Sequence, residues 1–530
     1  MKNNLDRLFF SLPLHLNLKS IKNIKNFIMK DDISMSLNPL VKFLKKPQKE
    51  FTKADIIRYM EDNEVSMVNF RYVAGDGKLK SLNFVVNSRD YLEQILSCGE
   101  RVDGSNIFPA TIHAGSSDLY VIPRFSTAFI DPFCERPTVS FLCSYFDKDG
   151  KPLETSPEYV LRQAHEAFTR VTKMKFQAMG ELEYYVIGER EDLFPTPDQR
   201  GYHEASPFAK FEQFRTECMY YIAQAGGLIK YGHSEVGNFT LGDKIYEQNE
   251  IEFLVTDVED AADQLVIAKW IIRSLAYEYG LDVTFAPKIT AGKAGSGLHI
   301  HTRIVDKHGV NKMVDKGKLN SIAKSAIAGY MTCASSLTAF GNTNPTSYFR
   351  LVPHQEAPTT VCWGDRNRSV LVRVPLGWTT KNDMVAAVNP LERPLNKDHS
   401  VKQTVEFRCP DGSADLYLLL AGLVVAARHG FEMEGALKLA EKTYVDVNIH
   451  QEENKGKLKS LEQLPASCWE SAEALAAHRA IFEKYGVFSP EMIDDIIKGL
   501  KSFNDKNIRK EIEKNPDKML EIVNTFFHCG

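Results

Sequence analysis

Two hydrophobic spacings alternate along the chain, and the change from one to the other predicts its elements. Apolar residues recur every three or four positions from Thr52 to Asn63, Pro157 to Met174 and Ala261 to Tyr279, which indicates helices. Shorter apolar runs rich in β-branched and aromatic residues predict strands at 67–73, 82–86, 119–122, 139–143, 182–187, 283–285 and 298–304. An Asp76-Gly77 pair between the first two strands is typical of a hairpin turn. The pattern therefore predicts a protein of mixed helices and strands.

The order of these elements divides the chain. A length of 530 residues exceeds what one compact core usually holds, so more than one domain is expected. The strand-rich first part ends near Asp147, and a segment with Lys, Gly and Pro at 148–152 follows as a linker. We therefore predict an N-terminal extension of residues 1–50, a first domain of residues 51–148 and a second domain of residues 149–530.

Charge separates the extension from the rest. The whole chain carries 65 Lys and Arg against 69 Asp and Glu, a net charge of −4 that gives no reason to expect nucleic-acid binding. Residues 1–50 hold 10 basic and 4 acidic side chains, a local charge of +6. Pro13, His15 and Asn17 interrupt the apolar stretch that follows Arg7, so we expect a solvated extension, not a targeting segment.

The cysteines and the apolar runs indicate the cellular compartment in which the protein is expected. The 9 cysteines are odd in number and scattered without a C-x-x-C pair, which favours reduced thiols. No uncharged apolar run approaches the roughly 20 residues that a membrane helix requires. We therefore expect a soluble, cytoplasmic protein without a membrane partner.

The first candidate for chemistry is a pair of carboxylates in an apolar strand. Alternation along a strand places Glu181 and Glu183 on one face, where like charges repel unless a cation lies between them. Such a pair more often faces solvent. The apolar neighbours Leu182, Tyr184 and Tyr185 favour instead a buried pair neutralised by a metal ion.

A second group of acids lies further along. His233, Glu235, Glu247, Glu250 and Glu252 fall at the ends of two predicted strands joined by residues 237–243. Oxygen-rich clusters suit Mg²⁺ or Mn²⁺. Taken alone, a charged hairpin is the commoner explanation.

Two further patterns could contact a substrate. A glycine-rich run, Gly292–Gly297, precedes a predicted strand on which His299 and His301 share one face, an arrangement suited to metal ligation or phosphate contact. Gly-rich turns before strands are common, so this pattern is weak by itself. Arginines on strand-like segments hold phosphate or carboxylate in bidentate pairs, although some could bridge subunits. The arginines concerned are Arg350, Arg368, Arg373 and Arg408.

Together these motifs resemble the glutamine synthetase family, in the family's order from Arg101 to about Glu473. Val102–Ile107 is similar to its F-D-G-S-S-I loop, and Ser126–Phe133 to its S-T-A-x-x-D-P-F segment. Asn344–Pro375 is similar to its N-x-x-S-Y-x-R-L-x-P…E-A-P…N-R-S…R-x-P signature.

The resemblance implies an α+β fold, with an N-terminal β-grasp-like domain packed against a catalytic domain that has a curved antiparallel sheet and surrounding helices. It implies an ATP-dependent ligation in which glutamate and ammonia give glutamine through a γ-glutamyl phosphate. It also implies a homo-oligomer with active sites between subunits, and the family's dodecamer of two hexameric rings is the expected assembly.

Residue roles follow from the same resemblance. Two or three divalent ions, Mg²⁺ or Mn²⁺, would bind each site, one held by Glu183, Glu235 and Glu250 and another by Glu181, His299 and Glu406. Arg368, Arg373 and Arg408 would hold the phosphoryl oxygens, with His233 and His301 beside the phosphates. Arg350 and Gly295 would bind glutamate. Asp103 of a neighbouring subunit would deprotonate ammonium, and Glu356 on a mobile loop would close the site against water.

Some positions depart from the family pattern. Ala294 stands where the family has Asn before G-S-G-x-H, and His354 where it has Gly in P-G-x-E-A-P. Glu252 is the nearest rival of Glu250, and an insertion from Thr379 to Gln403 separates Arg373 from Glu406.

Two alternatives to glutamine synthesis therefore stay open. They are a γ-glutamyl ligase for a larger amine, such as a γ-glutamylpolyamine synthetase, and a ring scaffold without activity. Asp103, Glu356 and the complete set of proposed metal ligands favour glutamine synthesis.

Overall fold

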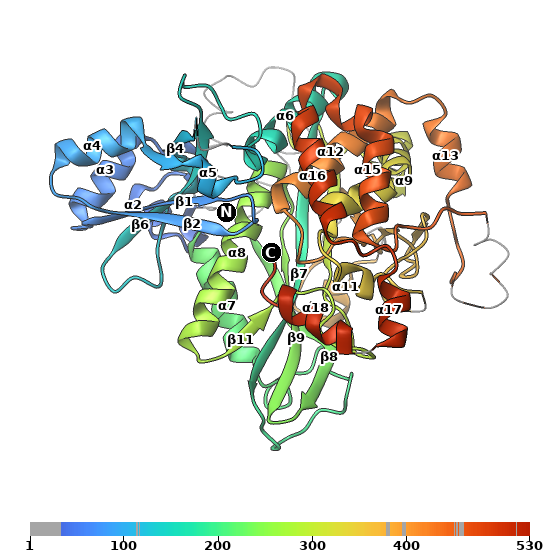
Figure 1. The fold of residues 1–530 in the computed structure, drawn as a ribbon. Helices are drawn as coiled ribbons and strands as arrows, with labels where there is room; N and C mark the ends of the chain where they lie inside the picture. Colours follow the sequence, from blue (N-terminus) through green and yellow to red (C-terminus); the bar gives the residue numbers. More distant parts are fainter. Residues whose placement is uncertain are drawn as a thin grey trace.

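A small domain lies beside a larger one in the computed structural model (Figure 1). The structure describes residues 33–112, 115, 117–353, 355–377, 382–394, 399–449, 451, 454, 460–515 and 517–530. Residues 1–32 of the predicted extension, and His354, lie outside the described residues.

The small domain is a mixed sheet with helices. Its sheet has the order β2-β1-β6-β4-β3, with β5 also pairing with β6, and only β1 and β6 run parallel. The strands are β1 (Met67–Val73), β2 (Leu79–Val85), β3 (Glu100–Asp103), β4 (Asp118–Pro123), β5 (Phe129–Ile130) and β6 (Thr138–Phe146). The helices are α2 (Pro39–Leu44), α3 (Lys53–Asp62), α4 (Arg89–Cys98) and α5 (Gly104–Ile107), with 3-10 turns at Gln48–Glu50 and Phe125–Thr127.

Local signals in this domain behave as the sequence predicts. Thr52 caps α3, since its hydroxyl accepts from the Asp55 backbone N–H and the Asp55 side chain accepts in return. Val73 pairs with Leu79 across the β1–β2 hairpin, and Gly77 in its turn has φ +74°, which favours glycine. The predicted helix and hairpin are confirmed.

The last part of the predicted extension is not solvated. Leu40 and Val41 of α2 are buried in the core of the small domain. Asn38 accepts a hydrogen bond from the Leu40 backbone N–H at 2.9 Å and donates to the Ala128 carbonyl at 3.1 Å. The prediction of a solvated extension is therefore wrong for residues 38–44. The local charge does not keep this segment in solvent, because two apolar side chains and the capping residue Asn38 are buried.

The large domain is built on a curved sheet of the order β15-β16-β17-β12-β7-β9-β8, in which β10 and β11 also pair with β7. All pairs are antiparallel except β15–β16. The strands are β7 (Lys175–Glu189), β8 (Ile229–Leu241), β9 (Lys244–Phe253), β10 (Thr256–Asp257), β11 (Asp282–Thr284), β12 (Leu298–Val305), β15 (Trp363–Asp365), β16 (Val372–Val374) and β17 (Val405–Phe407). A separate short pair is β13 (Val314–Asp315) with β14 (Lys318–Leu319).

One predicted connection is shorter than expected. The sequence predicts residues 237–243 as the link between two strands, but β8 continues to Leu241 and only Gly242 and Asp243 separate it from β9. Leu241 still pairs with Lys244, and Gly242 has φ +63° at the turn. The connection is therefore a two-residue turn.

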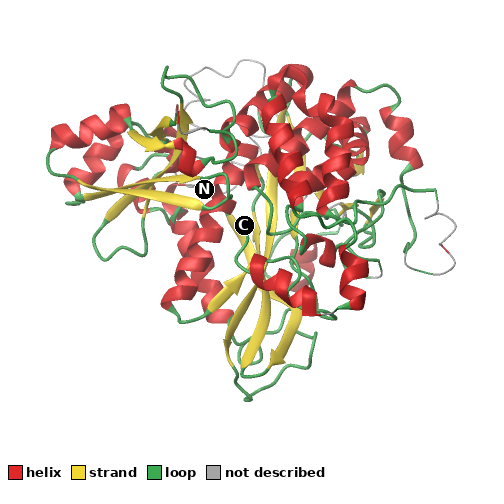
Figure 2. Cartoon of the chain, in the orientation of Figure 1, coloured by secondary structure: helices red, strands yellow, loops and turns green. Residues whose placement is uncertain are grey.

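Helices pack around the sheet, most of them on one side of the large domain (Figure 2). They are α6 (Pro157–Thr172), α7 (Glu212–Gln224), α8 (Val258–Glu278), α9 (Ser321–Gly341), α10 (Ser347–Arg350), α11 (Met384–Val388), α12 (Leu416–Glu432), α13 (Ala436–Lys442), α15 (Cys468–Glu483), α16 (Pro490–Ser502), α17 (Ile508–Lys514) and α18 (Asp517–Phe526). Within the described ranges no single helix is long and apolar enough to cross a membrane. Only α12 and α13 taken together pass on length and composition, and a bend of 112° separates them.

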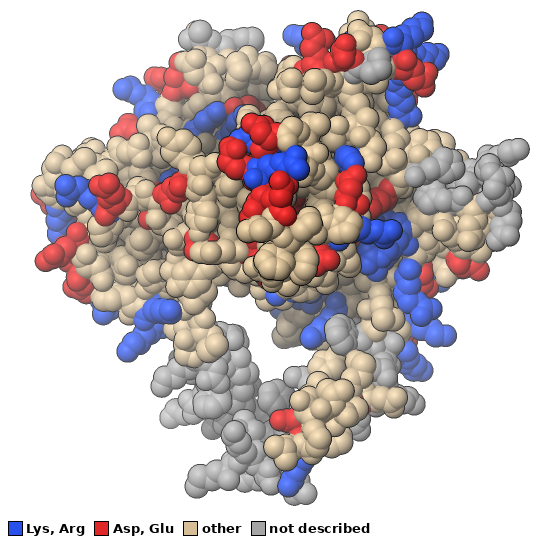
Figure 3. All heavy atoms as spheres, turned by 90° about the horizontal axis from the view of Figure 1, so that it is seen from below, with Lys and Arg blue, Asp and Glu red and all other residues tan. Residues whose placement is uncertain are grey.

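Charged groups join the two domains and also lie on the surface. Arg124 of the small domain forms a bidentate pair with Asp263 of α8, at 2.7 and 2.8 Å. On the face that Figure 3 shows, basic side chains (blue) and acidic side chains (red) are interspersed, in keeping with the near-neutral net charge.

Candidate functional site

A cavity of about 990 Å³ opens on the curved sheet of the large domain. Side chains from six of its strands, from helix α10 and from several loops line the cavity. Every site residue that the sequence predicts, with the exception of Asp103, belongs to this lining: Glu181, Glu183, His233, Glu235, Glu250, Gly295, His299, His301, Arg350, Glu356, Arg368, Arg373, Glu406 and Arg408.

Strand register explains how distant residues meet. Glu181 of β7 lies opposite His299 of β12, and Glu183 lies opposite Glu250 of β9. Glu250 in turn lies opposite His233 of β8. Because directly opposed residues of an antiparallel pair share a face, these pairs form rows across the sheet. The cavity floor is therefore made by the sheet itself.

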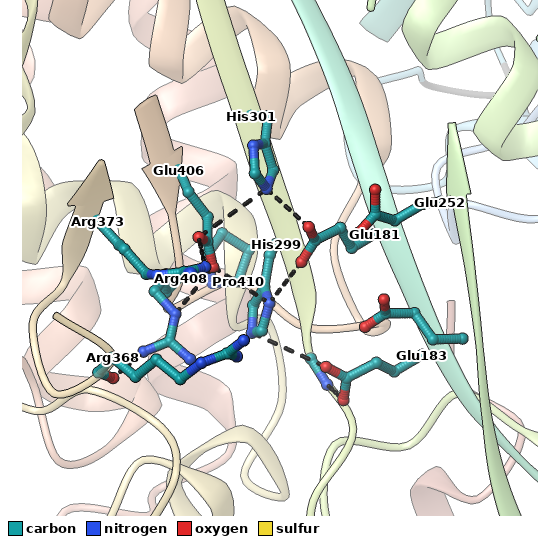
Figure 4. A network of polar contacts seen from close by, with 12 residues as sticks. Glu181, Glu183, Glu252, His299, His301, Arg368, Arg373, Glu406, Arg408 and Pro410 are labelled. Carbon is teal, nitrogen blue, oxygen red and sulfur yellow. Dashed lines mark hydrogen bonds and ion pairs between the residues drawn. The ribbon is translucent and has the colours of Figure 1, made fainter. Parts of the chain in front are cut away.

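One part of the cavity, here called the arginine side, consists of Glu181, Glu406, His299, His301, Arg373 and Arg408 (Figure 4). The Glu406 carboxylate accepts from Arg373 Nη1 at 2.8 Å and from Arg408 Nε at 2.9 Å. The Glu181 carboxylate lies 2.7 Å from His301 Nε2 and 3.0 Å from His299 Nδ1. Every carboxylate on this side therefore has a cationic or imidazole partner.

These partners change the ionisation of both carboxylates. Burial by itself would raise the pKa of Glu181, but His301 and His299 hold the pKa well below its usual value. Burial and the charge of Glu181 would also raise the pKa of Glu406, yet His301 and Arg408 lower it. Burial opposes protonation of His301, but the neighbouring Glu181 raises its pKa. The arginine side is a set of mutually neutralised charges.

The other part, here called the carboxylate side, consists of Glu183, Glu235, Glu250 and His233. His233 Nε2 lies 3.3 Å from Glu250 Oε1, and His233 Nδ1 lies 3.9 Å from Glu235 Oε1. Burial and the charge of Glu183 raise the pKa of Glu235 to about 8. Burial and the charges of Glu181, Glu183 and Glu235 raise the pKa of Glu250 well above its usual value.

Divalent ions fit this arrangement. Three groups each bring ligand atoms within 4.8 Å of one another: Glu181, His301 and Glu406; His233, Glu235 and Glu250; and Glu181, Glu250 and Glu252. Carboxylate oxygens with imidazole nitrogen suit Mg²⁺ or Mn²⁺. The raised pKa values of Glu235 and Glu250 are what crowded carboxylates show when no cation offsets them.

The histidines are arranged differently from the sequence-based grouping. That grouping joins His299 to Glu181 and Glu406 and leaves His301 to the phosphates. In the structure His301 belongs to the compact group with those two carboxylates. His299 lies between three acids, 3.0 Å from Glu181, 3.6 Å from Glu406 and 3.9 Å from Glu183.

The glycine-rich loop packs against Arg350. A Cβ on Gly297 would lie 2.5 Å from Arg350 Nη2, and one on Gly295 would lie 2.6 Å from the Pro287 carbonyl, so neither position accepts a side chain without movement. Gln248, which the sequence analysis does not identify, donates to the Gly295 carbonyl at 2.9 Å and to Glu183 Oε2 at 3.1 Å. The loop is thereby held to the carboxylate side.

Asp103 and Glu356 differ in position. Asp103 caps α5 on the small domain, accepts from the Ser105 backbone N–H at 2.9 Å, and does not line the cavity of its own chain. Hydrogen bonds from Ser105 lower the pKa of Asp103. Glu356 does line the cavity, and burial together with the charge of Glu183 raises its pKa.

Several residues that line the cavity were not predicted, because no motif in the sequence includes them. Lys230 and Tyr231 both contact Glu252, and Tyr202 and His203 stack with ring centroids 4.2 Å apart. His203 also lies 4.2 Å from His233, centroid to centroid. Tyr202 and His203 come from the loop after β7, and no spacing in the sequence connects that loop with the cavity.

Fold and site together define a two-domain protein class in which a β-grasp domain precedes a catalytic domain with carboxylates, imidazoles and guanidinium groups on a curved sheet. Residues 64–148 match the model of the glutamine synthetase β-grasp domain, and residues 154–517 match that of the glutamine synthetase catalytic domain. The chain belongs to the glutamine synthetase family. This is a family of oligomeric ligases that use divalent metals and ATP.

Similar proteins span nearly the same length. The glutamine synthetase of Thermus thermophilus is 28% identical over 448 residues, which cover 82% of this chain and 92% of the relative. That of Pyrococcus furiosus is 29% identical over 464 residues, covering 87% and 96%.

Solved structures share the fold. The chain superposes with a TM-score of 0.70 and 19% identity on the glutamine synthetase of Plasmodium falciparum, covering 87% of this chain and 97% of that one. It superposes with a TM-score of 0.69 and 19% identity on apo GmaS, covering 88% and 100%. At such identities the likeness establishes the fold alone.

Proposed function

We propose that the protein is a glutamine synthetase, which joins glutamate and ammonia at the expense of ATP through a γ-glutamyl phosphate. The observation that carries this proposal is the lining of the 990 Å³ cavity, which includes the predicted metal, phosphate and glutamate residues. Carboxylates for cations lie there beside arginines for phosphate, the two requirements of phosphoryl transfer.

Each part of the cavity has a role in this proposal. Glu183, Glu235 and Glu250 would hold one divalent ion, and Glu181, His299 and Glu406 another, with His301 within reach of the second. Bound ions would offset the charge that develops in phosphoryl transfer. Arg368, Arg373 and Arg408 hold phosphoryl oxygens with His233 alongside, Arg350 and Gly295 bind glutamate, and Glu356 excludes water from the acyl phosphate.

Asp103 supports an oligomeric site. Its carboxylate is exposed on the small domain, outside the cavity of its own chain. An ionised carboxylate accepts a proton from ammonium and leaves ammonia as the nucleophile. We propose that Asp103 of a neighbouring subunit completes each site in a cytoplasmic dodecamer of two hexameric rings, with the small domain at 51–148 and the catalytic domain at 149–530.

The test is phosphate release from ATP with Mg²⁺ and glutamate, comparing ammonium with a panel of amines that includes putrescine. Stimulation by ammonium, and its loss in Asp103→Ala with assembly unchanged, is the expected result. Full turnover with ammonium in Asp103→Ala would contradict the role of this residue. No turnover with any amine from a well-assembled ring would favour a scaffold instead.

A γ-glutamyl ligase for a larger amine is the second candidate. It is favoured by Ala294, whose methyl group offers no amide beside the glycine-rich loop, where the backbone N–H of Ala294 donates to Gln199 Oε1 at 2.7 Å. The fold alone does not select an activity, since the chain is similar to apo GmaS and to a glutamine synthetase at TM-scores of 0.69 and 0.70. A preference for a larger amine in the same assay would select this candidate.

A further inference from the structure

The carbonyl groups of the glycine-rich loop are held from behind the cavity by three buried side chains. The Ala294 carbonyl accepts from the Tyr185 hydroxyl of β7 at 2.9 Å, and the Gly295 carbonyl accepts from Gln248 Nε2 of β9 at 2.9 Å. The Lys288 ammonium donates to the carbonyl of the preceding loop residue. Three consecutive peptide groups are thereby fixed to three different segments of the large domain.

Of these three donors, Gln248 also contacts a predicted metal ligand. Its Nε2 lies 3.1 Å from Glu183 Oε2, and the Gly297 backbone N–H donates to the same oxygen at 2.7 Å. The other oxygen, Oε1, faces His299 Nε2 at 3.9 Å (Figure 4). Hydrogen bonds of this kind orient a ligating carboxylate, so Oε2 is tied to the loop and Oε1 is the oxygen left for a cation.

The orientation of the Gln248 amide is set by β8. The Gly237 backbone N–H lies 3.1 Å from Gln248 Oε1, and because an N–H only donates, the amide oxygen must face β8 and the amide nitrogen the loop. The packing here is tight. A Cβ on Gly237 would collide with the Tyr185 hydroxyl and lie 2.6 Å from Gln248 Oε1. Both donors are therefore pressed toward the loop.

We propose that Gln248 is a positioning residue for glutamate, which holds the glycine-rich loop in its binding conformation and turns Glu183 Oε1 toward the cavity. Gln248 does not line the cavity, so it acts through Gly295 and Glu183, which do. A loop that is held in place before the substrate arrives costs less to order on binding. The inference rests on the proposed function for the assignment of glutamate to this loop.

The first test is kinetic and uses Gln248→Met, which keeps the length of the side chain and removes the amide. In phosphate release with ammonium, the KM for glutamate should rise by about 10-fold or more, while the KM for ATP changes by less than about twofold. Gln264→Met is the matched control, because Gln264 is buried outside the cavity, where its Oε1 accepts the Leu228 backbone N–H at 2.9 Å. It should leave both constants within about twofold of the unchanged protein.

The second test needs no turnover. In the loop, the backbone N–H groups of Ala294 and Ser296 donate to Gln199 Oε1 at 2.7 Å and to the Pro287 carbonyl at 2.9 Å. Amide hydrogen exchange over residues 292–297 in the ligand-free, assembled protein should therefore be slow, and faster in Gln248→Met than in the unchanged protein or in Gln264→Met.

Gly237→Ala keeps the test decisive where Gln248→Met fails to assemble. The added methyl group displaces Tyr185 and Gln248 from the β8 side, so it should raise the KM for glutamate selectively and speed loop exchange. An unchanged KM for glutamate in a folded Gln248→Met variant, an equal rise for ATP, or unchanged loop exchange would overturn the inference. Failure of the unchanged protein to release phosphate would instead refute the proposed function, so the two failures are distinguishable.

Discussion

Two buried glutamates in one cavity behave in opposite ways. Glu406 on the arginine side and Glu250 on the carboxylate side are 1% and 5% exposed, and both lie on strands of the same sheet. Yet the neighbours of Glu406 lower its pKa, whereas those of Glu250 raise it. Both side chains are buried, so the difference comes from their partners: His301 and Arg408 lower the pKa of Glu406, whereas neighbouring carboxylates raise that of Glu250.

This contrast shows that the two sides of the cavity balance their buried charges in different ways. Burying an unpaired charge is costly, and a protein avoids that cost by pairing the charge or by leaving it to a bound cation. The arginine side carries its own counter-charge and is therefore preorganised. On the carboxylate side, the repulsion between the carboxylates is relieved when they are protonated or when a cation binds.

The largest expected effect is on activity and lies on the carboxylate side. Glu250→Gln keeps the shape of the side chain but removes a metal-binding charge, so ammonium-dependent phosphate release should fall by about 100- to 1,000-fold. The matched control is Glu247→Gln on the same strand, because Glu247 is buried outside the cavity, where it accepts the backbone N–H groups of Lys210 and Phe211. Equal losses of activity in both variants would mean that phosphate release does not depend specifically on the charge of Glu250.

The next largest effect is on the stability of the folded protein. A substitution on the arginine side should lower stability, whereas one on the carboxylate side should leave it unchanged or raise it. In metal-free protein Glu406→Gln leaves Arg373 and Arg408 without their carboxylate, which should cost about 3 kcal/mol and lower the melting temperature. Glu250→Gln removes repulsion and should leave the melting temperature unchanged or higher. Thermal unfolding at a fixed protein concentration checks both. A similar fall of the melting temperature in both variants would contradict the inferred difference between the arginine side and the carboxylate side.

The pH dependence of the metal-free protein follows from the same contrast. The pKa of Glu235 rises on folding from 4.5 to about 8, so the folded state binds more protons than the unfolded state between these values. Stability should therefore fall as pH rises from about 5 to 8. Glu406 has the opposite shift, so its contribution is present above pH 4.5 and lost on acidification.

Melting temperature against pH measures this, and Glu235→Gln should flatten the fall above pH 5. Saturating Mg²⁺ or Mn²⁺ should flatten it as well, because a bound cation favours the ionised carboxylate. A melting temperature that rises steadily from pH 5 to 8 in metal-free protein would contradict the assignment.

The smallest effect is expected outside the cavity. Lys244 and Glu189 form an ion pair in which Glu189 is 81% exposed, so solvent screens it. Lys244→Met should leave both the melting temperature and ammonium-dependent phosphate release unchanged. A measurable change would show that surface pairs on this hairpin matter as much as the buried ones.

Much of the fold follows from local patterns. The cap of Thr52 on α3, the Asp76-Gly77 turn and the strands at 67–73 and 298–304 are confirmed, because caps, turns and alternation act over a few residues. Alternation also predicts that Glu181 and Glu183 share a face, and both line the cavity. The family itself could be recognised from motif order alone.

Other features depend on contacts that no local pattern encodes. Burial of Leu40 and Val41 depends on contacts with distant parts of the small domain, and the short turn at Gly242 depends on the register of β8 and β9. Glu252 could be named only as a rival ligand, because its partner Lys230 reaches it through a bulge.

The sequence by itself determined which residues bring charge to this protein, and alternation determined which of them share a strand face. Only the tertiary structure decided which of these charges meet. Strand register places Arg373 opposite Glu406 and Glu183 opposite Glu250, so one carboxylate faces a guanidinium and the other a second carboxylate. The reason is physical: the period along a strand is a property of the local backbone, whereas the pairing across strands is set by the packing of the whole sheet.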